Sequence, residues 1–254
     1  MLALIKISYY STVQFIIDQF INLFQTFHSE KNNLPLISIS GLSESRQHNC
    51  HIVGSGLSAL STLEHCNPTE VFITSNLSVA LRKSWDVAFV ESDGNKNFCE
   101  KQVSALQGKL ISKLVFKNNY PHRHIKNFSR LNFDNKMPSF ILSESPFFGR
   151  RIHYASEVCW HDLGFEGMFH QYASSLFTMI RVAMYFRPKT ITLHGIDFGG
   201  QCFYHHEDWK HLDPGESTHI STRGRIESGN VKAVLLEISG VLLKQHKIEI
   251  LHAH

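Results

Sequence analysis

The sequence has few cysteines and no closely spaced pair of them. There are five, an odd number, at spacings that form no CxxC motif and do not repeat: Cys50, Cys66, Cys99, Cys159 and Cys202. This pattern argues against a disulfide scaffold and against a zinc ribbon, because both need paired cysteines. Scattered thiols behave as small buried apolar side chains and fit a reducing compartment. We therefore expect a cytoplasmic protein.

A strong excess of one charge is also absent. The 254 residues include 25 Lys and Arg against 22 Asp and Glu, a formal net charge of +3. A net charge this close to zero does not indicate binding to nucleic acid, and no nucleic-acid partner is expected. A hydrophobic fraction of 43% with 19% charged residues is typical of a folded globular protein. The one surplus is histidine, with 17 residues.

Residues 1–27 contain no apolar run long enough to cross a membrane. Polar residues interrupt the segment throughout, whereas a spanning helix needs roughly 18 or more uninterrupted apolar residues. From Val13 to Phe27 the apolar residues recur at helical spacing, which predicts an amphipathic helix. This helix is expected to pack on the domain or to form the interface of a homo-oligomer. The alternative is peripheral association with the inner face of the membrane.

From residue 50 onward, short apolar strands alternate with helices. Strands are predicted over 50–53, 71–74, 87–90, 113–116, 190–193 and 247–251, and helices over 58–66, 168–186 and 229–244. Residues 118–156 contain several prolines and are predicted to be mostly irregular. The fold class expected is α/β: a single three-layer α/β/α nucleotide-binding domain over 50–254, with a mostly parallel sheet and a lid loop over 199–219. Residues 1–49 supply the amphipathic helix and a linker, which holds a short strand over 36–39.

Two glycine turns follow predicted strands and are the candidate ligand sites. In HIVGSGLSAL, Gly54 and Gly56 follow the first core strand, and the amides at the start of the next helix suit a phosphate or a ribose. The motif lacks the third glycine of a dinucleotide fingerprint, so a simple tight turn stays an equal alternative. Asn76 ends the next strand and adds a polar group at the same sheet edge. In ITLHGIDFGG, Asp197 either caps the following turn or holds a sugar hydroxyl or a base edge.

The segment after Asp197 is rich in groups that bind ligands or transfer protons. It contains Tyr204, His205, His206, Glu207, Asp208, His211, Asp213 and His219. A metal site is one alternative, but no pair of these residues has the spacing of a HExxH motif. A single general base is the favoured alternative, because neutral imidazole can take a proton from a hydroxyl nucleophile near pH 7. His219 is the first choice, since it stands where the loop rejoins the fold.

Five segments, taken in order, resemble the bacterial sialyltransferases of glycosyltransferase family 42, of the lipooligosaccharide type. They are HIVGSGLSAL, TSN, HQYASSLFTMIRVAMYF, ITLHGIDF, and STHIS ahead of NVKAVLLEISGVLLKQHKIEIL, and the resemblance spans residues 50 to 251. It implies an inverting, metal-independent transferase without a cofactor. Such an enzyme moves sialic acid or a related ulosonic acid from a CMP donor to a hydroxyl of a cell-surface glycan, such as a lipooligosaccharide or a capsule.

The resemblance also implies roles for individual residues. His219 would be the base that deprotonates the acceptor hydroxyl, with Arg225 as the alternative, and Tyr204 would hydrogen-bond the departing phosphate. Gly195 and Asp197 would lie beneath the cytidine or its ribose. The other implied donor-binding residues are Gly54, Ser55, Gly56, Ser58, Asn76, Glu91, Ser174 and Ser175.

The chain departs from the family pattern at several of these positions. Ser55 replaces an asparagine, Leu57 replaces a proline, and Gly199 stands where a first lid tyrosine is expected. Glu91 replaces another asparagine and leaves open a different CMP-activated acid such as Kdo. Two rival functions stay open as well: a pterin pyrophosphokinase-like enzyme, with Mg²⁺ on carboxylates such as Asp197, Asp208 or Asp213, and a nucleotide-sugar-binding protein that has lost catalysis.

Overall fold

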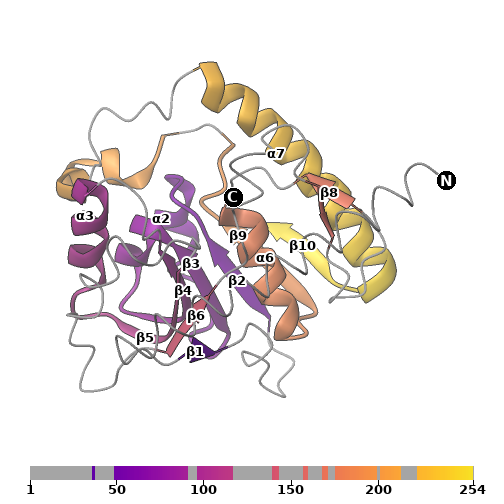
Figure 1. Ribbon diagram of the computed structural model, residues 1–254, viewed down its shortest axis with the longest axis horizontal. Coiled ribbons are helices and arrows are strands. Elements are labelled where there is room, and N and C mark those ends of the chain that lie inside the picture. Colours follow the sequence, from indigo (N-terminus) through magenta and orange to yellow (C-terminus); the bar gives the residue numbers. More distant parts are fainter. Residues whose placement is uncertain are drawn as a thin grey trace.

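One eight-stranded sheet forms the centre of the computed structural model (Figure 1), which describes residues 36–37, 49–90, 96–116, 139–142, 157–159, 168–170, 175–198, 201–212 and 222–253. The strand order is β1-β6-β5-β4-β3-β2-β9-β10, and every neighbouring pair is parallel. The strands are β1 (Leu36–Ile37), β2 (Cys50–Val53), β3 (Val71–Ser75), β4 (Ser84–Val90), β5 (Leu110–Phe116), β6 (Ser139–Leu142), β9 (Thr190–His194) and β10 (Glu249–His252). A separate antiparallel pair joins β7 (Glu157–Cys159) to β8 (Met168–His170).

Helices cover both faces of the sheet (Figure 1). The α-helices are α2 (Ser58–Thr62), α3 (Lys96–Leu106), α6 (Ser175–Tyr185) and α7 (Thr222–Val241), and α7 continues as a π-helical turn, η6 (Leu242–His246). The 3-10 helices are η2 (Asn76–Leu81), η4 (Phe203–His205) and η5 (Glu207–Leu212). The described residues contain no helix that combines the length and the apolar character needed to span a bilayer.

The two faces of the sheet pack into two separate apolar clusters. Because successive side chains of a strand point to opposite faces, Cys50 and Ile52 of β2 join α6 and α7, whereas Val53 joins the cluster around α2, α3 and η2. The same alternation runs through β3 and, from Val87 onward, through β4. The predicted three-layer α/β/α arrangement with a parallel sheet is therefore confirmed.

The direction of strand order reverses at β2. From β2 the chain runs outward through β3, β4, β5 and β6, and it returns later to place β9 on the opposite side of β2. In open α/β sheets, ligands bind outside the carboxyl ends of the strands at such a reversal. The turns that follow β2 and β9 meet at this point, and the site is built there.

The predicted helix over 168–186 is wrong at its beginning. Met168–His170 forms β8, paired with β7, and α6 begins only at Ser175. The apolar residues of β8 fit a helical period as well as a strand, and only pairing with a distant segment decides between them. β6 is an ordered strand within the span predicted to be mostly irregular, and α3 was not predicted. The N-terminal amphipathic helix lies outside the described residues.

Candidate functional site

The turn after β2 packs directly against the turn after β9. The backbone N–H of Gly54 donates to the carbonyl of His194 at 2.8 Å, and that of Gly56 donates to the carbonyl of Gly195 at 2.8 Å. These bonds extend the pairing of the two strands beyond their ends. Two motifs separated by about 140 residues in the sequence are therefore held as one unit at the strand-order reversal.

Both turns need glycine because they approach each other so closely. Gly195 has a φ of +63°, which favours glycine, and a Cβ there would lie 2.8 Å from the Cβ of Ala59. A Cβ on Gly56 would overlap the carboxylate of Asp197. Packing between the turns is thus sufficient to require these glycines, without a ligand beside them.

Asp197 connects the second turn to the start of α2. Its Oδ1 accepts a hydrogen bond from the Ser58 hydroxyl at 2.5 Å, and its Oδ2 accepts from the Ser58 backbone N–H at 3.2 Å. The Leu57 N–H donates to the carbonyl of Gln201 at 3.2 Å. Asp197 thus holds the start of α2, in a different segment from the turn that follows it. The backbone amides at the start of α2, which were expected to bind a phosphate, already donate to protein acceptors. Asp197 is exposed, and its bonds to Ser58 fix the position of its carboxylate.

Asn76 follows β3, next to the turn of β2. Its backbone has a φ of +53°, a left-handed conformation that Asn tolerates better than most residues. Its side-chain Oδ1 is buried and has no hydrogen-bond partner among the described residues. A buried acceptor without a partner costs free energy, so a donor from a ligand would stabilise it. Among the predicted site residues that the structure describes, Asn76 is the one with a buried side-chain acceptor that lacks a partner.

Residues 201–212 are packed onto the first turn. The Phe203 N–H donates to the carbonyl of Ser55 at 2.7 Å, and the Ser55 hydroxyl lies 3.5 Å from the Cys202 sulfur. The side chains of Phe203 and Tyr204 are 0% and 5% exposed and meet edge to face. The described part of the expected lid loop is therefore anchored in the core cluster on the α2 side, and Tyr204 is held in place by it.

Buried and half-buried polar side chains form a hydrogen-bonded chain at β2 and β9 that the sequence motifs did not predict. His51 Nδ1 lies 2.9 Å from His194 Nε2, His51 Nε2 lies 2.6 Å from Glu70 Oε2, and His194 Nδ1 lies 3.0 Å from the Thr62 hydroxyl. Burial, with His51 and Arg82 nearby, lowers the pKa of His194 to about 4. Burial also raises the pKa of the Cys66 thiol, which lies 3.8 Å from His194 Nε2. The sequence signal for this contact is that both histidines stand among the apolar residues of strands.

The structure leaves other predicted site residues outside its description or away from these contacts. Glu91, Ser174 and His219 lie outside the described residues. Ser175 is the first residue of α6, on the opposite face of the sheet from α2, and Arg225 lies within α7. In the loop considered for a metal, His206 lies 3.7 Å from Asp208. Among the described residues, the only His, Cys, Asp and Glu side chains gathered as a metal site would need are His51, Cys66 and His194.

No protein-family model matches the chain, and no curated protein matches it either. Several solved structures are similar over most of the length. They include a CstII sialyltransferase from Campylobacter jejuni with cytidine-5'-monophosphate (19% identity, 82% of this chain and 80% of that chain, TM-score 0.40). Another is the sialyltransferase CST-II with a trisaccharide acceptor and CMP (20% identity, 81% and 80%, TM-score 0.42). A third is an alpha-2,3-sialyltransferase from Campylobacter jejuni in apo form (19% identity, 83% and 76%, TM-score 0.41). At these values the likeness carries no argument about what this chain does.

Proposed function

We propose that this chain is a glycosyltransferase that moves sialic acid or a related ulosonic acid from a CMP donor to a hydroxyl of a cell-surface glycan. One observation carries the proposal: three of the motifs that resemble family 42 meet at one place. HIVGSGLSAL, TSN and GIDF lie at the carboxyl ends of β2, β3 and β9, which are adjacent in the sheet. The strand-order reversal where they meet is the position at which such folds bind nucleotides.

The side chains at this place suit a nucleoside. The fixed carboxylate of Asp197 can accept from ribose hydroxyls, and the buried Oδ1 of Asn76 can accept from the amino group of a cytosine. The Ser55 hydroxyl offers a further donor or acceptor beside them. The proposal thus assigns the nucleoside to the turns and leaves the sugar to the segment after Asp197.

The reaction is a single displacement. His219 takes the proton of the acceptor hydroxyl as its oxygen attacks the anomeric carbon of the donor, and CMP leaves with the bonding electrons. The Tyr204 hydroxyl donates to the departing phosphate, where negative charge increases. Because the leaving group is stabilised by hydrogen bonding, this step needs no divalent cation.

CMP binding tests the nucleoside site. Titration calorimetry without added divalent ions is expected to show one CMP per chain. Asn76→Gly, which keeps the left-handed backbone and removes the amide, should weaken CMP binding about tenfold, the equivalent of one lost hydrogen bond. Arg187→Gly is the matched control, because Arg187 is exposed and has a φ of +49°. Absence of CMP binding by the folded wild type would contradict the proposal.

Variants of the proposed base separate an enzyme from its alternatives. In a transferase assay, His219→Ala should lower turnover by about 100-fold or more, while CMP binding persists. Unchanged turnover would show that His219 is not the base. Nucleotide binding without turnover in the wild type would favour the binding protein, and Mg²⁺-dependent consumption of ATP would favour the pyrophosphokinase.

A further inference from the structure

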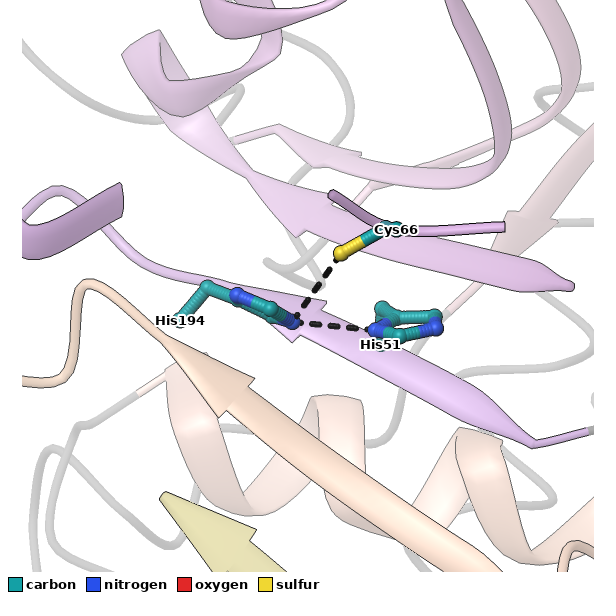
Figure 2. Close-up of side chains that lie close together, drawn as sticks. All are labelled: His51, Cys66 and His194. Carbon is teal, nitrogen blue, oxygen red and sulfur yellow. Dashed lines mark hydrogen bonds between the residues drawn. The ribbon is translucent and has the colours of Figure 1, made fainter. Parts of the chain in front are cut away.

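Three potential metal ligands lie close together (Figure 2). His51 comes from β2, His194 ends β9, and Cys66 lies four residues after the end of α2. The ring nitrogens His51 Nδ1 and His194 Nε2 are 2.9 Å apart, and the Cys66 sulfur lies 3.8 Å from His194 Nε2. All three potential ligand atoms lie within 4.8 Å of one another. Both histidines are buried, at 7% and 2% exposure.

The outer nitrogen of His51 is held by a carboxylate. Glu70 Oε2 lies 2.6 Å from His51 Nε2, and Glu70 Oε1 accepts a hydrogen bond from the Asn49 amide at 2.8 Å. An ionised carboxylate only accepts hydrogen bonds, so the proton of a neutral His51 ring is on Nε2. Nδ1 of that ring then presents a lone pair towards His194.

The outer nitrogen of His194 is oriented in the same way. The Thr62 hydroxyl donates its only proton to the carbonyl of Ser58 at 2.8 Å, so its oxygen accepts from His194 Nδ1 at 3.0 Å. A neutral His194 ring therefore presents a lone pair at Nε2. Two lone pairs thus face each other at 2.9 Å beside a thiol, an arrangement that needs a positive centre between them.

We propose that His51 Nδ1, His194 Nε2 and Cys66 Sγ bind Zn²⁺. Zinc takes tetrahedral nitrogen and sulfur ligands at about 2.0–2.1 Å and about 2.3 Å, which sets ligand atoms roughly 3.3–3.6 Å apart. The two ring nitrogens are 2.9 Å apart, His194 Nε2 and the Cys66 sulfur are 3.8 Å apart, and all three atoms lie within 4.8 Å of one another, so the ligands must shift by some tenths of an ångström or more to reach this geometry. On binding, the Cys66 thiol releases its proton to solvent and the thiolate forms the Zn–S bond, and water occupies the fourth position.

The surrounding groups match those that orient zinc ligands. Metal-binding histidines usually donate the proton of their second nitrogen to a carboxylate or another oxygen. Glu70 provides the carboxylate for His51, and the Thr62 hydroxyl provides the oxygen for His194. The ion would join β2, β9 and the chain after α2. The site is independent of the proposed transferase activity.

Metal content and cobalt substitution test this site. The full-length protein, purified under reducing conditions and stripped of metal, should bind one equivalent of Zn²⁺ in competition with a chromophoric chelator. One equivalent of Co²⁺ should give a thiolate charge-transfer band in the near ultraviolet. Cys66→Ser should abolish that band, whereas Cys202→Ser, the matched change of another half-buried cysteine, should keep it. Glu70→Gln should weaken zinc binding about 10- to 100-fold.

Two results would overturn the proposal. One is folded wild-type protein, with normal far-ultraviolet circular dichroism, that binds no stoichiometric Zn²⁺ or gives the same cobalt spectrum as Cys66→Ser. The other is a nitrogen-15 spectrum in which the His51 ring carries protons on both nitrogens and stays unchanged when one equivalent of Zn²⁺ is added. In that case a proton, and not a metal ion, lies between the two rings. Neither result bears on CMP binding, so the transferase proposal is tested separately.

Discussion

The two faces of the sheet differ in the side chains that the same strands give them. On the α6 side, β2 contributes Cys50 and Ile52, and β9 contributes Ile191 and Leu193, all to one apolar cluster. On the α2 side the same two strands contribute the buried histidines His51 and His194. Both faces stabilise the sheet through apolar burial. The α2 side adds a buried, hydrogen-bonded pair of histidines next to the turns at the strand-order reversal.

A cavity on the α6 side should have the largest effect on stability. Phe177 is 2% exposed, and Phe177→Ala is expected to lower the free energy of unfolding by about 3–5 kcal/mol through lost burial and an unfilled cavity. Leu236→Ala, at a side chain that is 66% exposed, should change it by at most about 0.5 kcal/mol. Urea unfolding measures both variants. Equal losses would mean that this cluster does not carry the stability of the sheet.

The contact between the turns should have the next largest effect. Gly195→Ala adds left-handed strain and a clash with Ala59, and we expect a loss of about 2–4 kcal/mol in the free energy of unfolding. Gly108→Ala is the matched control, because Gly108 has a φ of +69° and no heavy atom within 4 Å of an added Cβ. It should lose only about 1–2 kcal/mol, from backbone strain alone. If the two variants lose the same amount, close packing between the turns is not the reason for Gly195.

The hydrogen bonds of Asp197 should have the smallest effect on stability. Ser58→Ala removes the hydroxyl donor to Asp197 at the exposed start of α2, and a loss of about 1 kcal/mol is expected. Ser61→Ala, which removes an exposed hydroxyl bound to a backbone carbonyl of the same helix, should be nearly neutral. CMP affinity should fall in Ser58→Ala and not in Ser61→Ala. Equal affinities would separate Asp197 from the nucleoside.

The elements that position the site were largely predictable from local pattern. The strands ending at Val53, near Ser75 and at His194 are short apolar runs followed by glycine or asparagine, which mark strand ends in any context. Their meeting at one edge followed from the parallel sheet that the alternation of strands and helices predicts. The contact between the two turns could not be predicted from local pattern, because that contact depends on which strands are neighbours in the sheet.

The buried histidines show the same limit. In CHIV and ITLH, His51 and His194 look like interruptions of apolar runs. Their proximity depends on the pairing of β2 with β9, and Cys66 joins them only because α2 is short and turns back over the sheet. The histidine-rich loop was predicted to hold functional residues because of its composition. His51 and His194, which meet in the described structure, are isolated from other histidines in the sequence.

The most direct test of the central proposal is nucleotide release from activated sugars. The protein should be incubated with CMP-sialic acid, CMP-Kdo or a UDP-sugar, with a glycan acceptor and no added divalent ion. We expect release of CMP from a CMP donor, reduced in Asn76→Gly and unaffected in Arg187→Gly. Release from UDP-sugars alone, or CMP release that Asn76→Gly leaves unchanged, would contradict it.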